Sequence, residues 1–373
     1  MRILVINWQD RRNPLAGGAE DHLHRVFSRI ARKGHDVTVL CSHFDGAPGE
    51  EMADGLRIVR QGSRALFNYA VPGAYRRLRS RGFDLIVEDL NKIPFFTPLY
   101  VREPLVGIGH HLFRSSIYRQ VNPVAATYVY GMETVALRYY ARRRIPFIVN
   151  SPSTFGDFAA HGFSPKDLTV VYPAINHDLF RPAGVPKSST PLVACFGRIK
   201  KYKSLDILLH ALPRVLREVP ELKVVIAGEG DDRPRLERIA QDLGLAGVVK
   251  FTGYISEEQK VELLQKVWFK VATSIKEGWG LTVSEANACG TTVLASDVPG
   301  LRDAVRDGET GILFPYGDRE KLAGEMIRLL NDRPLRDRLS QNAIAFAAKY
   351  TRDEEASQTL RVLESVAGEG KRR

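Results

Sequence analysis

The amino-acid sequence predicts an α/β protein with two Rossmann-like, doubly wound parallel-sheet domains. The chain has 373 residues, which is too long for one ordinary α/β core and suits two. Strands alternate with helices from residue 2, and the alternation restarts at residue 191. Residues 178–191 between them are rich in Pro, Gly and Ser and show no periodicity. We therefore expect an N-terminal domain over 1–182 and a C-terminal domain over 183–350, with a helix over 351–373 that joins the first.

The first half opens with a strand, a glycine-rich loop and an amphipathic helix. Residues 2–7 form an apolar run typical of a buried parallel strand. Residues 21–33 then place apolar side chains on one helical face, and Gly34 is predicted to end that helix. Further strands are expected at 36–41, 84–87, 105–108 and 147–150.

The second half repeats this order with a basic loop after its first strand. Strand 191–196 leads into loop 197–203, and Ser204 is predicted to cap a helix over 205–217. Further strands are expected at 222–227, 248–252, 269–273 and 292–295, helices at 232–243, 256–267, 281–289 and 300–306, and several helices within 319–367. Two such domains bind ligands beyond the carboxyl ends of their strands, so we expect them to face each other across a cleft.

Composition excludes several classes of protein. No apolar stretch approaches the roughly 18 residues of a membrane span, and the N-terminus lacks a signal peptide, so a cytoplasmic protein is expected. Cys41, Cys195 and Cys289 lie far apart in apolar settings, as free buried thiols in a reducing compartment do. No nucleic-acid-binding motif accompanies the positive charge, so a nucleic-acid partner is not expected.

Positive charge gathers in the first half of the chain. The net charge is +11, and residues 64–144 hold 13 Lys and Arg against 5 Asp and Glu. Two interpretations stay open: peripheral contact with an anionic membrane surface, worth ~1 kcal/mol per basic residue, or a solvated basic face. The apolar and aromatic segment 121–140, followed by Arg142–Arg144, allows the same choice between a helix on a membrane and a helix packed on the sheet; we favour the packed helix.

Three strand ends offer the backbone N–H groups and cations that a diphosphate needs. The first is Gly17-Gly18, where the missing side chains let the backbone approach an anion, although an ordinary strand-to-helix turn has the same sequence. The second is Gly197-Arg198 with Lys203. Arg grips an oxyanion bidentately and Lys adds a point charge, although a solvated basic loop is the alternative.

The third and most informative segment is EGWGLTVSEA, residues 277–286. Gly278 and Gly280 expose backbone at the start of a helix near Leu281, where free N–H groups and the helix dipole favour phosphate. Glu277 and Glu285 are poor partners for phosphate but accept hydrogen bonds from sugar or ribose hydroxyls. An acidic first turn that compensates the helix dipole would explain Glu285, but not the Gly-Trp-Gly before it.

These segments, in this order, resemble the retaining glycosyltransferases of family 4, which have the GT-B fold. The resemblance covers nearly the whole chain: AGGAE, VYPAINHDLFRP, FGRIKKYKSLDILLHAL, VVIAGEGDDRPRLE, VKFTGYIS and EGWGLTVSEANACGTTVLASDVPGLRDAVRDGETGILF. The glutamate pair Glu277 and Glu285 is its most specific part. The chain departs from the family pattern at Trp279, where phenylalanine is usual, and at Thr291-Thr292, where Pro-Val is common.

The resemblance implies a role for each matching residue. Gly17 and Gly18 would approach the diphosphate of a nucleotide-sugar donor, and Arg198 and Lys203 would neutralise it. Glu277 would bind the sugar hydroxyls and Glu285 the ribose. The segment Gly278, Trp279, Gly280 and Leu281 would assist the phosphates, and Gly253, Tyr254 and Ile255 would border the base. Of the doublet His110-His111, a histidine would lie near the transferred sugar, and we favour His110; loop hydrogen bonding is the alternative.

The resemblance further implies a hexosyltransferase of polysaccharide or glycolipid biosynthesis that retains the anomeric configuration. The acceptor would attack from the face of the leaving diphosphate, with no protein nucleophile, metal or further cofactor. The acceptor itself, an unknown hydroxyl on a glycan, a lipid-linked sugar or a small molecule, has no signature. Alternatives are another GT-B enzyme such as a phosphorylase or nucleotide-sugar epimerase, a dinucleotide oxidoreductase, which the missing G-x-G-x-x-G disfavours, and a two-lobed binding protein.

Overall fold

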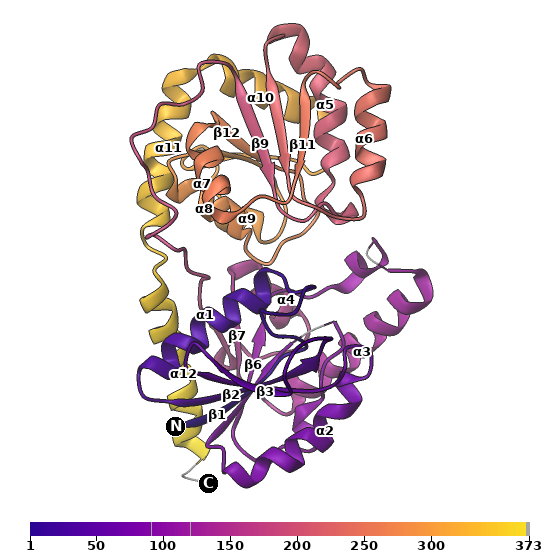
Figure 1. Cartoon of the computed structure of the whole chain (residues 1–373), viewed down its shortest axis with the longest axis vertical. Helices are drawn as coiled ribbons and strands as arrows, with labels where there is room; N and C mark the ends of the chain where they lie inside the picture. Colours follow the sequence, from indigo (N-terminus) through magenta and orange to yellow (C-terminus); the bar gives the residue numbers. More distant parts are fainter. Residues whose placement is uncertain (91, 120, 371–373) are drawn as a thin grey trace. The chain divides into compact units, whose positions relative to one another are not determined.

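A computed structural model describes residues 1–90, 92–119 and 121–370, and the chain divides into two compact units (Figure 1). Unit 1 comprises Met1–Ala174 and the chain from Arg352 onward, and unit 2 comprises Ile175–Thr351. The division falls before the predicted boundary at 182/183 because Ile175 pairs with Thr351 as a β-bridge and its N–H donates to Tyr350 O, at 3.0 Å. Those bonds fasten the start of the linker to the end of unit 2.

Unit 1 is built on an eight-stranded sheet in the order β3-β4-β2-β1-β5-β6-β7-β8, parallel except for the β3–β4 pair. Its strands are β1 (Arg2–Ile6), β2 (Asp36–His43), β3 (Glu50–Ala53), β4 (Leu56–Ser63), β5 (Leu85–Asp89), β6 (Leu105–Gly109), β7 (Phe147–Val149) and β8 (Leu168–Val170). Its helices are α1 (Gly18–Arg32), α2 (Phe67–Leu78), α3 (Pro123–Arg142), α4 (Pro152–Ala160) and α12 (Arg352–Gly370). Short 3-10 turns cover Arg79–Arg81, Thr97–Leu99, Arg114–Arg119 and Pro165–Asp167.

Alternation along β1 explains the layers of unit 1. Ile3 and Val5 pack in a core with α1 and α12, whereas Leu4 and Ile6 pack in a second core with α2. A strand buried on both faces is nearly continuously apolar, as residues 3–6 of β1 are. Helix α12 lies beside α1 although it comes from the end of the chain (Figure 1), so the C-terminal segment is part of unit 1.

Unit 2 is built on a six-stranded parallel sheet in the order β11-β10-β9-β12-β13-β14. Its strands are β9 (Leu192–Phe196), β10 (Lys223–Ala227), β11 (Val249–Gly253), β12 (Phe269–Ala272), β13 (Val293–Ser296) and β14 (Gly311–Phe314). Its helices are α5 (Leu205–Glu218), α6 (Arg233–Asp242), α7 (Glu257–Lys266), α8 (Leu281–Ala288), α9 (Leu301–Ala304), α10 (Arg319–Asn331) and α11 (Arg333–Ala347), with a 3-10 turn over Lys201–Lys203. Strands β10 and β11 lie on one side of β9, and the later strands β12, β13 and β14 lie on its other side. The carboxyl ends of β9 and β12 therefore form a topological switch point, where doubly wound sheets bind ligands.

The predicted strands are present in both units, each within one or two residues of its expected ends. The strands β3, β4, β8 and β14 were not predicted. Glutamates in β3 and Arg57 and Arg60 in β4 hide their apolar alternation, while β8 and β14 are too short to show a period.

Three local expectations have clear outcomes. Gly34 has a φ of 90° after α1, as predicted for a helix stop. Ser204 stands at the N-cap of α5, but the prediction that its side chain caps the helix is wrong: its φ is 50°, and its hydroxyl pairs with Tyr316 Oη at 3.0 Å. The helix predicted over 121–140 is α3, and its buried residues Leu137 and Tyr140 pack with Phe147 of β7.

Over residues 1–90, 92–119 and 121–370 no helix combines the length and apolarity that crossing a bilayer requires. Cys41, Cys195 and Cys289 are buried and free, as predicted.

Candidate active site

The carboxyl ends of β9 and β12 open onto a pocket of about 410 Å³ in unit 2. Four of the predicted site residues line it: Arg198, Lys203, Glu277 and Gly280. The strands bring them together because β9 runs directly into Gly197 and Arg198, and its neighbour β12 runs into the loop that carries Glu277. The pocket therefore lies at the switch point of the sheet and is lined by several charged groups.

Lys203 and Glu277 form an ion pair in the wall of the pocket. Lys203 Nζ lies 2.5 Å from Glu277 Oε1, which also accepts a hydrogen bond from Ser274 Oγ at 2.6 Å. The backbone around them is tied as well, since Thr273 Oγ1 donates to Lys203 O at 2.9 Å. Burial opposes the charge of Lys203, but the adjacent Glu277 carboxylate outweighs burial and raises the pKa of Lys203 above its ordinary value. The ammonium is thus held charged, with its position fixed.

Arg198 is the second cation of the pocket. Its side chain is exposed, and within the part of the chain that the structure describes its guanidinium has no carboxylate or carbonyl partner. Its loop is held by the glycines after β10: a Cβ on Gly228 would lie 2.0 Å from Gly197 O, and one on Gly230 would lie 1.9 Å from Ile199 O. The Gly-Glu-Gly sequence is the signal for this close approach, which only glycine allows.

The loop of Glu277 is fixed by a second glycine contact. Gly300, after β13, has a φ of 82°, and a Cβ there would lie 2.2 Å from Glu277 O. Glu277 N–H donates to Pro299 O at 3.1 Å. Gly280 has a φ of 74° and precedes α8, so the backbone at Leu281 begins that helix, as predicted. Trp279, predicted among the donor-binding residues, is buried: its Nε1 donates to Ser284 Oγ at 2.8 Å, so its ring supports the loop from behind.

Glu285 and the segment 253–255 are not in the wall of this pocket. Glu285 lies on α8, where Lys260 Nζ of α7 approaches its Oε2 to 2.9 Å. No local sequence pattern predicts Lys260 as its partner. Gly253 ends β11, two strands away from β9, and has a φ of 73°. Tyr254 follows with 78% of its surface exposed, and Ile255 is half-buried. Their roles as ribose and base contacts stay predictions.

In unit 1 the glycine-rich loop joins β1 to α1. Gly17 is extended, with a φ of −131°, and Gly18 is the first residue of α1. Gly17 N–H donates to Glu20 Oε2 at 2.7 Å, and Gln9 Nε2 lies 3.2 Å from Glu20 Oε1. The Gly17 N–H is therefore engaged by the first turn of α1, and the predicted approach of Gly17 and Gly18 to the donor diphosphate stays a prediction.

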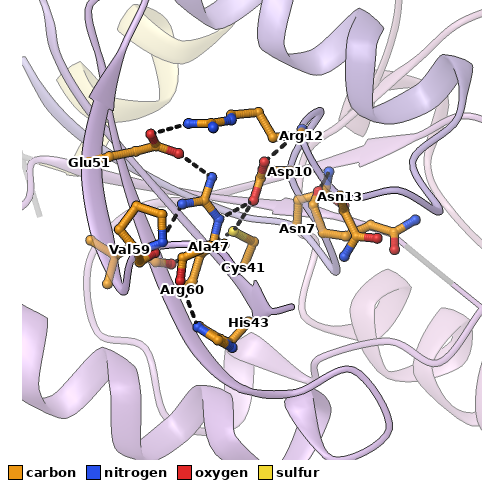
Figure 2. A network of polar contacts seen from close by, with 12 residues as sticks. Asn7, Asp10, Arg12, Asn13, Cys41, His43, Ala47, Glu51, Val59 and Arg60 are labelled. Atoms are coloured by element: carbon orange, nitrogen blue, oxygen red, sulfur yellow. Dashed lines mark hydrogen bonds and ion pairs between the residues drawn. The ribbon is translucent and has the colours of Figure 1, made fainter. Parts of the chain in front are cut away.

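A buried ionic network holds the start of that loop (Figure 2). Arg60 of β4 lies between two carboxylates, with its Nε 2.6 Å from Asp10 Oδ2 and its Nη2 2.5 Å from Glu51 Oε1. Cys41 Sγ donates to Asp10 Oδ2 at 3.4 Å, and Arg12 N–H donates to Asp10 Oδ1 at 2.8 Å. Burial opposes ionisation of Asp10, but the hydrogen bond from Arg60 outweighs it and lowers the pKa of Asp10. The network fixes the backbone that leads to Gly17.

A second pocket, of about 380 Å³, lies in unit 1 beside the carboxyl ends of β6 and β7. Most of its wall is apolar, and its polar lining includes His22, His110 and Glu355. His110 Nε2 lies 3.0 Å from Asp89 Oδ1, and His22 Nε2 of α1 bonds Glu355 of α12. The two imidazoles meet edge to face, with centroids 5.4 Å apart. Of the predicted doublet, His110 lines this pocket, whereas the ring of His111 packs on Phe113.

Within that pocket, burial opposes the charge of His22, but the Glu355 carboxylate outweighs it and raises the pKa of His22. His22 and Glu355 are 333 residues apart in the sequence, and no local pattern pairs them. The AGGAE loop is the only nearby signal, because it leads into α1 and so to His22.

Known proteins resemble this chain in both sequence and fold. The family model for glycosyl transferases group 1 matches residues 177–346, and the model for glycosyltransferase family 4 matches residues 16–179. A D-inositol 3-phosphate glycosyltransferase of Streptomyces bingchenggensis is 31% identical over 351 residues, covering 87% of this chain and 75% of that protein. The protein of the same name from Streptomyces scabiei is 30% identical, covering 93% and 86%.

Solved structures share the fold at lower identity. A sucrose-phosphate synthase from Thermosynechococcus elongatus superposes with a TM-score of 0.83 at 21% identity, over 98% of each chain. HepE of Anabaena, solved in complex with UDP and glucose, gives 0.74 at 19% identity, over 98% of this chain and 100% of that one. Two parallel-sheet domains of this type define the GT-B fold of glycosyltransferases. The chain belongs to glycosyltransferase family 4, the group 1 glycosyl transferases, and is a glycosyltransferase.

Proposed function

We propose that this glycosyltransferase moves a hexose-type sugar from a nucleotide-diphosphate sugar to a hydroxyl acceptor with retention of the anomeric configuration. The observation that carries the proposal is the pocket at the switch point of unit 2, where Arg198 and Lys203 face the same space as Glu277. Two cations beside a carboxylate suit a ligand with a diphosphate at one end and hydroxyls at the other. The UDP in the HepE structure makes uridine the first base to test.

The proposed mechanism gives each group one task. The bond between the anomeric carbon and the diphosphate oxygen breaks while the acceptor oxygen attacks from the same face, and the leaving phosphate takes the acceptor's proton. Arg198 and Lys203 stabilise the negative charge that grows on the leaving diphosphate. Glu277, whose position Lys203 and Ser274 fix, accepts hydrogen bonds from the sugar hydroxyls. This scheme uses no metal, no further cofactor and no protein nucleophile.

The experiment is a thermal-shift screen of the purified protein with UDP, GDP, ADP, dTDP and their sugar conjugates. A ligand at 100 times its Kd adds about 2.7 kcal/mol to the free energy of unfolding. Stabilisation by one nucleotide series, followed by NMR of the transferred sugar with the donor's anomeric configuration, supports the proposal. Stabilisation by NAD or a free sugar alone, or a product of inverted configuration, contradicts it. Turnover of the donor to an epimer, or phosphate-dependent breakdown of a glycan, identifies the alternative GT-B enzymes.

We further propose that a lipid-linked acceptor brings unit 1 to an anionic membrane surface. Val124, Tyr128 and Val135 of α3 are exposed apolar side chains, and exposed Arg142–Arg144 lie at the end of that helix. Apolar and basic side chains on one helix suit an anionic bilayer surface. Flotation with phosphatidylglycerol vesicles tests this: the wild type should float, a Val124→Ser/Val135→Ser variant should float less, and absence of wild-type binding contradicts the proposal.

A further inference from the structure

Lys270 is a lysine inside the parallel sheet of unit 2. It is the second residue of β12, which lies between β9 and β13, and only 1% of its surface is exposed. Its backbone N–H donates a hydrogen bond to Thr292 O at 3.0 Å. Its ammonium, by contrast, makes no hydrogen bond or ion pair with any residue of 1–90, 92–119 or 121–370. A buried charge without an acceptor destabilises the fold, so its presence needs a reason.

The charged groups around Lys270 are already engaged elsewhere. Those that act on its charge are Cys195 of β9, Lys203, Glu277 and Glu285 of α8. Glu277 is bound by Lys203 and Ser274, and Glu285 is bound by Lys260. Burial raises the pKa of the Cys195 thiol to about 12, so the thiol is neutral and offers no negative charge. No carboxylate is left that belongs to Lys270 alone.

Burial accordingly lowers the pKa of Lys270 to about 8. Without a ligand, Lys270 is therefore partly deprotonated at a pH near 8. An anion placed beside it would favour the charged form and cause the protein to take up a proton on binding.

Lys270 also lines the 410 Å³ pocket that holds Arg198 and Lys203. We propose that Lys270 is a third cation of this pocket and that its ammonium binds the diphosphate of the nucleotide-sugar donor from the sheet side. This inference rests on the proposed function, because it takes the ligand to be a nucleoside diphosphate. It adds a residue that lies within a strand, whereas Arg198 and Lys203 lie in the loop after β9. The ligand site would thus include a cation carried by the sheet itself.

The test is isothermal titration calorimetry of UDP and of uridine at pH 8, each in two buffers of different ionisation enthalpy. The wild type should take up a fraction of a proton with UDP and none with uridine. UDP itself contributes little to the measured proton uptake, because the second pKa of a phosphate is about 6 and UDP is almost fully deprotonated at pH 8. Lys270→Met should abolish the uptake and weaken UDP about 10- to 100-fold, while uridine binding stays unchanged. Without ligand, Lys270→Met should unfold at a higher denaturant concentration than the wild type, because an unpaired buried charge is gone.

Lys187→Met is the matched control. Burial of its ammonium also lowers the pKa of Lys187 to about 8, but it donates to Thr291 Oγ1 at 2.5 Å and lies outside the pocket. It should keep the wild-type proton uptake and UDP affinity. Lys270→Met with wild-type affinity and proton uptake would overturn the inference and leave the proposed function standing. Failure of the wild type to bind UDP, GDP, ADP or inorganic pyrophosphate would overturn both.

Discussion

The two pockets of this glycosyltransferase differ in the chemistry of their lining residues. The pocket of unit 2 is charged: Arg198, Lys203 and Glu277 reach it from the loops after β9 and β12, and Lys270 reaches it from within β12. The pocket of unit 1 is mainly apolar, and its ionisable lining residues are His22, which pairs with Glu355, and His110, which pairs with Asp89 outside the wall. The difference fits the proposed function, in which unit 2 holds the diphosphate. A diphosphate needs several fixed cations, whereas a neutral hydroxyl acceptor and sugar need shape and a few hydrogen-bonding groups.

The same difference appears in how each unit treats buried charge. Unit 1 satisfies its buried ions internally, as the Arg60 network does with Asp10 and Glu51. Unit 2 leaves Lys270 without an acceptor and Arg198 without a partner over the described residues. Buried charges that are paired within the protein favour its stability. A charge without a partner in the protein is available to bind a ligand.

The largest expected effect is on stability in unit 1. Arg60→Met should lower the free energy of unfolding by about 3–5 kcal/mol, because it leaves the buried Asp10 carboxylate without its cation. Denaturant titration at neutral pH measures it, with Arg11→Met, in an exposed pair with Asp54, as a control that should change little. An Arg60→Met loss no larger than that of the control would mean that this network does not hold the loop.

The same network predicts an acid-dependent loss of stability. Asp10 has a pKa in the folded state below its unfolded value of about 3.9. Its contribution is therefore present above pH 4 and is lost as pH falls through the folded pKa. Asp10→Asn should lower stability at neutral pH and flatten its dependence on pH below 4. If Asp10→Asn and the wild type lose stability equally below pH 4, other carboxylates cause the acid sensitivity.

The next effect is on turnover in unit 2. Lys203→Ala should raise the barrier by about 3–4 kcal/mol, a factor of about 10²–10³ in kcat, because the leaving diphosphate loses a fixed cation. Arg198→Ala should act in the same direction. Lys200→Ala is the control, since Lys200 lies in the same loop but pairs with Asp231 at 2.9 Å on the surface. Near-wild-type turnover in both pocket variants would contradict the assignment of the cations.

A smaller effect is expected from the histidine pair of unit 1. Because the folded pKa of His22 is raised, its stabilising contribution is complete below the unfolded value of about 6.5 and is lost as pH rises through the folded pKa. Glu355→Gln should remove about 1.5–3 kcal/mol at pH 5.5 and less at higher pH. Urea titrations across this pH range compare it with Glu354→Gln, an exposed neighbour on α12, whose curve should match the wild type. Equal losses at all pH values would mean that His22 is neutral.

The smallest effect concerns the base. Tyr254→Ala removes an exposed aromatic side chain that is predicted to border the nucleotide base, and stacking of this kind contributes about 1 kcal/mol or more. The Kd of UDP should rise about fivefold, while that of inorganic pyrophosphate should stay the same. An equal change for both ligands would place Tyr254 near the phosphates or nowhere near the ligand.

How far the sequence predicts the molecule depends on how local each feature is. Arg198, Lys203 and Glu277 could be predicted because each follows an apolar strand within a few residues, and the sheet order brings those strand ends together. Lys270 could not, because a lysine in a strand usually indicates an exposed face. Glu355 could not, because it meets His22 only after α12 returns to α1.

The same reasoning explains an error in local structure. Ser204 has the residue type of a helix cap, but its left-handed backbone sends the hydroxyl to Tyr316. A tertiary partner decided the outcome, and the residue type alone could not reveal that partner. Trp279 is buried with its indole N–H bonded to Ser284, and its predicted contact with the donor stays a prediction.

The central claim is that the switch-point pocket of unit 2 binds the diphosphate of the donor. A crystal structure of the protein with UDP tests it most directly. The account predicts phosphate oxygens within hydrogen-bonding distance of Arg198 and Lys203, with Lys270 Nζ turned toward the same group. UDP bound elsewhere, with Arg198 and Lys203 free of phosphate, would contradict it.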